Sequence, residues 1–337
     1  MRAVGYQTPG QLSDDVLRDV ELPEPVATGR DLLVAVDAVS VNPVDTKQRR
    51  ATPPAPGGWK VLGWDAAGTV LACGPDVTLF APGDRVFDAG DIGRQGTNSE
   101  RHLVDERIVG RAPANLSPAE AAALPLTSLT AWEMLFDRLD VRRPVPGAAS
   151  AIVIVGGAGG VGSIAIQIAR ALTDLTVIAT ASRPETAEWA RGLGAHHVID
   201  HARPIAAQVA AVGLGAAPGF VFDTTQGNQH LAEIGALIAP QGRLGMIADT
   251  EGLNHGLLRT KSISIHWEYM FTRAQYATPD IGAQGAILNR IADLVEEGRI
   301  RSTLTEVMGT IDAATLTRAH ALIESGTARG KIVLAGF

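Results

Sequence analysis

The chain has 337 residues, of which 46% are hydrophobic and 19% charged, so it can form two domains of ordinary size. Its net charge of −7 and its lack of a basic run exclude nucleic acid as the expected main partner. No apolar run approaches the roughly 18 residues that a membrane-spanning helix needs, so no membrane partner is expected.

Cellular location can be judged from two further features. Residues 1–6 include no long apolar segment, so we expect no secretory signal. Cys73 is the single cysteine, which excludes an intramolecular disulfide and agrees with a reducing compartment. We therefore expect a cytoplasmic protein.

The first 120 residues have the pattern of a β-rich domain. Strands are predicted over 32–41, 61–71 and 85–87, and a Pro/Gly cluster over 53–58 predicts a loop. Short strands broken by turns favour a small barrel over βαβ repeats.

The character of the sequence changes at Ser117. Ser117 fits a helix N-cap, Pro118 the first helical position and Glu120 the third residue of a capping box. The alanine-rich helix that starts here leads towards residues 127–135, which we interpret as the entry to a second domain.

A glycine-rich turn dominates that second domain. The β-branched run 151–155 is typical of a strand buried on both faces, and G-x-G-x-x-G follows it. Here Gly157 would permit the tight turn, Gly159 would let a pyrophosphate approach, and Gly162 would let the helix pack on the strand. A glycine-rich loop without a ligand is the alternative, but a second strand over 176–181 favours dinucleotide binding. The predicted contacts of the turn are Gly157, Ala158, Gly159, Gly160, Val161 and Gly162.

The end of the second strand predicts which dinucleotide is bound. An NAD enzyme of this design places Asp or Glu there, whereas this chain has Ala181-Ser182-Arg183. Ser182 could donate to a 2′-phosphate and Arg183 could hold it with its planar fork, so NADPH is the expected cofactor. The alternative is that Ser182 only caps a helix, in a capping box with Glu185, while Arg183 faces solvent.

The remaining pattern alternates between strands and helices. Short strands are predicted over 197–200, 220–225, 242–247 and 262–267, which indicates a doubly wound parallel sheet. A last helix should begin after Asp312 and end before Gly326, followed by a strand over 331–334.

Six segments follow one another in the order found in a known family: residues 41–45, 62–68, 82–86, 123–127, the turn at 156–162, and 330–334. Together they resemble the medium-chain dehydrogenase/reductase superfamily, over essentially the whole chain. The closest resemblance is to the quinone oxidoreductase branch, including bacterial proteins labelled zinc-type alcohol dehydrogenase-like. It implies an α/β protein with a GroES-like β-rich catalytic domain (1–126 and 271–337) and a Rossmann NADP-binding domain (127–270). It also implies an active site in the interdomain cleft and, since most members are dimers or tetramers, a homodimer.

The zinc ligands of that superfamily are missing. Its zinc-dependent members bind the metal through a cysteine on the Asn42 side, a Gly-His-Glu motif and another cysteine. This chain has Asn42 itself, Gly63-Trp64-Asp65 in place of the motif, and an isolated Cys73. A catalytic zinc site needs at least three converging ligands, so no metal is expected.

The resemblance also places residues beside the substrate and the nicotinamide. Asn42, Asp45 and Trp64 are the candidate catalytic residues, and Asp65 could line the same pocket. Alternatively, Asn42 fixes a turn, Asp45 caps a helix and Trp64 belongs to the core. Thr127 is expected at the nicotinamide, although it could simply bond to its own helix.

Five more residues are carried over by resemblance to the cofactor site. His201 and Lys331 would approach phosphate, while Asp223, Met246 and Ile247 end strands near the cofactor. The alternatives are that His201 and Lys331 are solvated, and that Asp223 caps the segment after its strand.

Taken together, these features predict an NADPH-dependent, zinc-free reductase of quinones or α,β-unsaturated carbonyl compounds. A conjugated acceptor is already electron-poor, so hydride transfer to it depends less on a Lewis acid than alcohol oxidation does. One alternative is a non-catalytic NADPH-binding redox sensor; a zinc alcohol dehydrogenase is a third possibility, disfavoured by the missing ligands.

Overall fold

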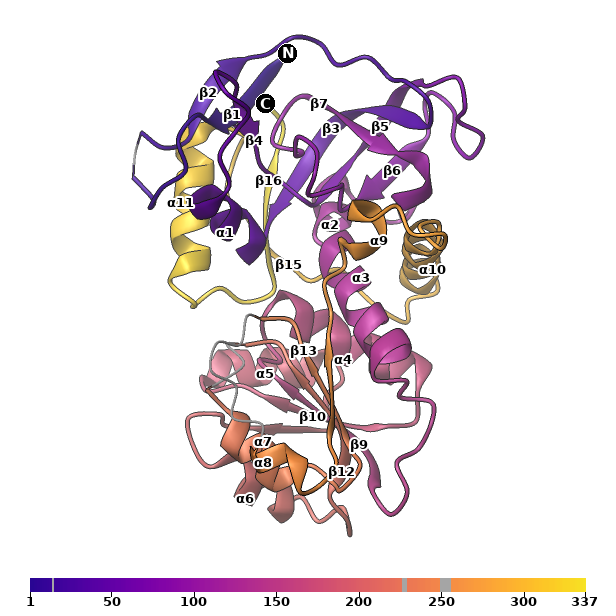
Figure 1. Ribbon diagram of the computed structural model, residues 1–337, viewed down its shortest axis with the longest axis vertical. Coiled ribbons are helices and arrows are strands. Elements are labelled where there is room, and N and C mark those ends of the chain that lie inside the picture. Colours follow the sequence, from indigo (N-terminus) through magenta and orange to yellow (C-terminus); the bar gives the residue numbers. More distant parts are fainter. Residues whose placement is uncertain (14, 226–228, 249–255) are drawn as a thin grey trace. The chain divides into compact units, whose positions relative to one another are not determined.

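The computed structural model describes residues 1–13, 15–225, 229–248 and 256–337 (Figure 1). Its contacts divide the chain into two compact units, one of residues 1–129 with 271–337 and one of residues 130–270. The chain therefore passes from the first unit to the second between residues 129 and 130, whereas the sequence placed this boundary between 126 and 127. The chain returns to the first unit after residue 270.

The first unit is built around the long strand β3 (Asp31–Val41), which pairs antiparallel with β5, β7 and β16. Strand β16 comes from the C-terminal end of the chain, so segments far apart in the sequence form one seven-stranded sheet of order β15-β16-β3-β5-β6-β8, with β7 on β3. A three-stranded sheet of order β2-β1-β4 completes the β structure of this unit. The other strands are β1 (Arg2–Tyr6), β2 (Arg18–Glu21), β4 (Lys60–Val61), β5 (Ala66–Cys73), β6 (Arg85–Asp88), β7 (Arg101–Asp105), β8 (Val109–Arg111), β15 (Leu304–Val307) and β16 (Lys331–Ala335).

The predicted strand over 61–71 is interrupted in the structure. Gly63 has φ +110, and a Cβ there would lie 2.6 Å from Thr97 Oγ1 and 2.9 Å from the backbone nitrogen of Asn98. Only glycine fits this left-handed, crowded position. Residues 62–65 therefore leave the strand between β4 and β5, and this break places Trp64 and Asp65.

Two helices of the first unit, α2 and α11, begin where the sequence predicts. The Ser117–Glu120 capping box is present, with Glu120 N bonded to Ser117 Oγ at 3.3 Å and Ser117 N to Glu120 Oε2 at 2.9 Å. Asp312 caps α11, which lies beside α1 (Figure 1). The helical segments are α1 (Pro43–Ala51), the 3₁₀ turn η1 (Glu106–Ile108), α2 (Pro118–Ala122), α3 (Pro125–Trp132, which crosses into the second unit), α9 (Thr272–Gln275), α10 (Ala283–Glu296) and α11 (Ala313–Glu324).

The second unit is a doubly wound sheet. Its six strands are all parallel, in the order β11-β10-β9-β12-β13-β14, which is the 3-2-1-4-5-6 order of a dinucleotide-binding fold. The strands are β9 (Ala149–Val155), β10 (Thr176–Thr180), β11 (His197–Ile199), β12 (Pro218–Asp223), β13 (Arg243–Met246) and β14 (Ser264–Trp267). The helical segments are the π-helix η2 (Glu133–Arg138), α4 (Gly160–Leu172), α5 (Pro184–Gly192), α6 (Ile205–Ala211), α7 (Leu231–Leu237) and α8 (Gly256–Arg259).

Strand β9 is central in that sheet, and its residues 151–155 are completely buried. Val153 and Val155 pack in one apolar cluster with residues of β12, β13 and α7. This core fixes the carboxyl ends of β9, β10 and β12, where the glycine turn lies. Within the described residues, no helix is long and apolar enough to cross a membrane.

Candidate functional site

The glycine turn joins β9 to α4 and opens the helix with free N–H groups. Gly159 is the N-cap of α4, which runs for 13 residues from Gly160. No acidic side chain lies in the first turn of this helix, so the positive end of its dipole faces the loop without a carboxylate nearby in sequence. A helix start of this kind favours a phosphate ligand.

The glycines of the turn divide their tasks differently from the prediction. Gly156, with φ +78, makes the tight turn that the sequence assigned to Gly157. Gly157 is needed for packing instead, because a Cβ there would lie 2.7 Å from Ala179 Cβ on β10. Gly162 packs the helix on the strand as predicted, since its Cβ would lie 2.3 Å from Gly156 O.

Gly159 is the position that leaves room for a ligand. A Cβ built on Gly159 meets only Gly156 O, at an ordinary 3.5 Å. Gly159, Gly160 and Val161 are partly exposed, whereas Gly157, Ala158 and Gly162 are buried. Protein packing therefore accounts for glycine at 157 and 162 but not at 159, and the chain fits a pyrophosphate there.

We expect Gly159→Ala to lose mainly cofactor affinity and Gly162→Ala to lose stability as well. Gly159→Ala should keep the melting temperature within a few degrees while cofactor affinity falls by about tenfold or more, because the methyl group fills the phosphate approach. Gly162→Ala should lose stability as well, because its methyl group strikes the backbone of Gly156. Thermal unfolding and calorimetric titration of both variants check this; normal cofactor binding by Gly159→Ala would contradict it.

The region proposed for the 2′-phosphate needs one correction. The Ser182–Glu185 capping box is wrong: α5 begins one residue later, with Arg183 as N-cap. Arg183 N donates to Thr186 Oγ1 at 3.2 Å, so the threonine hydroxyl does the capping. Glu185 instead pairs with Arg183, at 3.1 Å between Nε and Oε1. Ser182 is exposed and is not the helix cap.

Three other predicted cofactor residues end strands of the same sheet. Asp223 is buried at the end of β12, and its Oδ1 accepts from Thr225 N at 2.9 Å and Thr225 Oγ1 at 2.7 Å. Asp223 therefore caps the segment after β12, which is the alternative that the sequence offered for it. Met246 ends β13 and is fully buried, while Ile247 just beyond it is partly exposed.

His201 is neither solvated nor isolated. It is half-buried beyond β11, and its Nδ1 lies 3.1 Å from Thr180 Oγ1 at the end of β10. Burial lowers the pKa of His201, and the neighbouring His230 lowers it further, against a smaller opposing effect of Asp200.

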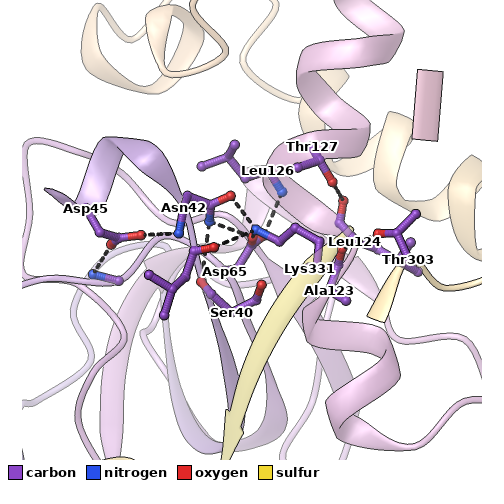
Figure 2. A network of polar contacts seen from close by, with 12 residues as sticks. Ser40, Asn42, Asp45, Asp65, Ala123, Leu124, Leu126, Thr127, Thr303 and Lys331 are labelled. Carbon is purple, nitrogen blue, oxygen red and sulfur yellow. Dashed lines mark hydrogen bonds and ion pairs between the residues drawn. The ribbon is translucent and has the colours of Figure 1, made fainter. Parts of the chain in front are cut away.

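A second group of predicted residues meets in the first unit, in a buried polar network (Figure 2). Asn42 Nδ2 donates to Asp65 Oδ2 at 2.7 Å, and Lys331 Nζ lies 3.0 Å from the same oxygen. Lys331 also donates to Asn42 Oδ1 and, at 3.1 Å, to Val41 O. All three ammonium protons therefore have acceptors.

The two carboxylates of the network hold backbone N–H groups. Asp65 Oδ1 accepts from Leu126 N at 2.7 Å, in the first turn of α3. Asp45 Oδ2 accepts from Asn42 N at 2.6 Å and its Oδ1 from Gly63 N at 3.0 Å. The network thus ties together β3, α1, the 62–65 break, α3 and β16.

Burial dominates the charge balance of the network. It raises the pKa of Asp45 to about 7, an effect that Asp65 adds to and that Lys331 and the two backbone donors oppose. The pKa of Asp65 is also raised by burial, while Lys331 opposes the rise. The ammonium is thus the positive charge that compensates these buried carboxylates.

These contacts revise several predicted roles. Lys331 is 3% exposed and bonded within the network, so its assignment to phosphate is wrong, and so is the solvated alternative. Asn42 directs its amide into the network, and Asp45 caps α1 as the alternative proposed. Trp64 is fully buried, edge-on to Phe271 with ring centroids 6.1 Å apart, as expected of a core residue. Thr127 is buried and donates to Leu124 O at 3.2 Å.

Three residues of these sites were missed or underrated by sequence reasoning. Asp65 was expected at most to line a pocket, yet it is the centre of the network. Thr180 and Thr224 flank the glycine turn: Gly156 N donates to Thr180 Oγ1 at 3.0 Å, and Thr224 Oγ1 donates to Val155 O at 2.7 Å. The sequence did contain a signal for these two threonines: each lies at the carboxyl end of a strand that pairs with β9, namely β10 and β12.

The chain matches two protein-family models. Residues 28–114 match the alcohol dehydrogenase GroES-like domain, and residues 193–334 match the zinc-binding dehydrogenase model. A zinc-type alcohol dehydrogenase-like protein, SACOL2177 of Staphylococcus aureus (strain COL), is 41% identical, with 99% of each chain covered. The chain belongs to the medium-chain dehydrogenase/reductase superfamily.

Solved structures of superfamily members agree with the fold. A protein from Rhizobium etli CFN 42, described as a zinc-dependent alcohol dehydrogenase, is 64% identical with a TM-score of 0.98, covering 100% of this chain and 98% of that one. A quinone oxidoreductase of Pseudomonas syringae pv. Tomato DC3000 is 26% identical with a TM-score of 0.83, covering 99% of both chains. A mycobacterial protein complexed with NADPH has the same identity, TM-score and coverage.

The residues present do not fit the zinc ion that these superfamily descriptions imply. Asn42 and Trp64 stand where the motif requires cysteine and histidine, and the Lys331 ammonium beside Asp65 would repel a divalent cation. Among the residues that the structure describes, no cluster of three His, Cys, Asp or Glu side chains could hold a metal ion.

Proposed function

We propose that this oxidoreductase is an NADPH-dependent reductase of quinones or α,β-unsaturated carbonyl compounds that works without zinc. Two features together carry the proposal. The glycine turn leads into a helix start that favours phosphate, and β10 is followed by Ser182 and Arg183 rather than by an acidic residue. The Lys331 ammonium group beside Asp65 supports a site without a metal ion. We also propose a cytoplasmic homodimer.

The chain's own residues would bind and orient the cofactor. Residues 157–162 would hold the pyrophosphate at the start of α4, and Ser182 and Arg183 would hold the 2′-phosphate. When bound, NADPH supplies the hydride; the protein supplies its position and excludes water. An acceptor activated by conjugation needs less electrophilic help than an alcohol would, which selects quinones and enones.

A substrate panel tests this proposal. Purified protein without a metal-binding tag should oxidise NADPH in the presence of ortho- or para-quinones or α,β-unsaturated ketones, and a chelator should leave the rate unchanged. Ethanol and benzyl alcohol should not be oxidised with NADP⁺. Alcohol oxidation that depends on stoichiometric zinc would refute the proposal. Cofactor binding without any turnover would instead identify an NADPH-binding sensor.

A further inference from the structure

Thr180 connects the glycine turn to a histidine. Its side chain is fully buried at the carboxyl end of β10, and its Oγ1 accepts the Gly156 N–H at 3.0 Å. Its backbone carbonyl accepts the N–H of Gly157 at 3.0 Å. One residue therefore holds two successive amides of the turn, including Gly156, which has the left-handed conformation.

The hydroxyl proton of Thr180 needs an acceptor. His201 Nδ1 lies 3.1 Å from Thr180 Oγ1, and it can accept that proton only when the imidazole is neutral with its own proton on Nε2. Burial and the proximity of His230, whose ring centroid is 5.9 Å away, both favour the neutral form; Asp200 is the charged neighbour that opposes them. The protonation state of His201 thus sets the direction of the Thr180 hydroxyl.

We propose that Thr180 and His201 are positioning residues of the dinucleotide site. Neutral His201 accepts from the Thr180 hydroxyl, which leaves the oxygen lone pairs directed at Gly156 N and holds the turn in the shape that receives the pyrophosphate. Neither residue needs to touch the cofactor. The proposal rests on dinucleotide binding at the turn but not on the preference for NADPH.

The first test is Thr180→Val, which keeps the shape of the side chain and removes its hydroxyl. We expect NADPH and NADH to bind about 5- to 30-fold more weakly, since a hydrogen bond to a buried N–H is lost. Thr180→Ser should restore affinity to within about twofold. Thr173→Val is the matched control: its hydroxyl bonds Ala169 O at 2.7 Å at the far end of α4, so stability should fall while affinity stays.

Hydrogen exchange provides a readout that does not depend on binding. In the protein without cofactor, Thr180→Val should speed amide exchange over residues 156–160, and Thr173→Val should not. Unchanged exchange at the turn, or wild-type affinity for both cofactors in Thr180→Val, would overturn the proposal. If wild type binds NAD⁺ but not NADPH, the cofactor proposal fails while this one is still tested.

The second test follows affinity with pH, using NAD⁺ because it lacks the 2′-phosphate that itself titrates near pH 6. Burial lowers the pKa of His201 below its ordinary value of 6.5, so the imidazole is still neutral at pH 6.5 and becomes protonated only as the pH falls through this lowered pKa. Calorimetric affinity for NAD⁺ should therefore weaken on acidification in wild type and stay level in His201→Gln. Tighter binding of NAD⁺ by wild type at acid pH would instead assign His201 a direct charge on the phosphates and defeat the positioning role.

Discussion

Replacing Arg183 by alanine should weaken NADPH binding by roughly 10- to 150-fold and leave NADH binding almost unchanged. Hydrogen bonds to charged groups contribute about 1.5–3 kcal/mol, and about 1.4 kcal/mol corresponds to a tenfold change in affinity. The Arg183 side chain is 41% exposed and lies at the start of α5, where the helix dipole also favours an anion. Fluorescence titration of both cofactors measures the effect.

Glu185 provides the matched control for that prediction. It pairs with Arg183 in the structure, so a bound phosphate competes with its carboxylate for the same guanidinium. Glu185→Gln should tighten NADPH binding by a few fold and leave NADH unaffected. An equal loss of both cofactors in Arg183→Ala, or a wild-type preference for NADH, would refute the assignment of NADPH.

The largest loss of stability is expected from Lys331→Met. The substitution keeps an apolar stem but leaves Asp65 buried without its cation, and breaking a buried ion pair on one side costs about 3–5 kcal/mol. Asn42 Oδ1 also loses its donor. Urea denaturation should show the reduced free energy of unfolding.

Two further variants separate charge from packing. The double variant Lys331→Met with Asp65→Asn should recover part of the loss, because it no longer buries an uncompensated carboxylate. Lys261→Met is a matched lysine control, since Lys261 Nζ donates to the carbonyls of Ala236 and Ile238, and it should cost far less. If the two single lysine variants lose equal stability, the ion pair is not what Lys331 contributes.

Most of the fold could be predicted from local signals. The capping boxes, the β-branched runs and the glycine turn each specify an element within a few residues, and the alternation of strands and helices specifies a parallel sheet. Errors occurred where tertiary packing decides. Gly156 and Gly157 are adjacent glycines, and only the position of Ala179 on β10 shows which one turns and which one packs.

The candidate site was less predictable because its contacts join distant segments. Lys331 and Asp65 are 266 positions apart, and no local pattern shows that they meet. A lysine before a strand is usually solvated, so chain position suggested phosphate or solvent when the true partners were Asn42 and Asp65. Thr180 contacts His201 across neighbouring strands, and that register becomes visible only when the sheet is formed.

The Trp64–Asp65 pair has a consequence for the modularity of the chain. Asp65 holds Leu126, just before the chain leaves the β-rich unit, and Trp64 packs on Phe271, where it returns. The residues that flank the second unit in the sequence, Leu126 and Phe271, therefore contact two adjacent residues, Asp65 and Trp64. A domain inserted at a single place in this way can be gained, lost or exchanged as a unit, without interrupting any strand of the domain that carries it.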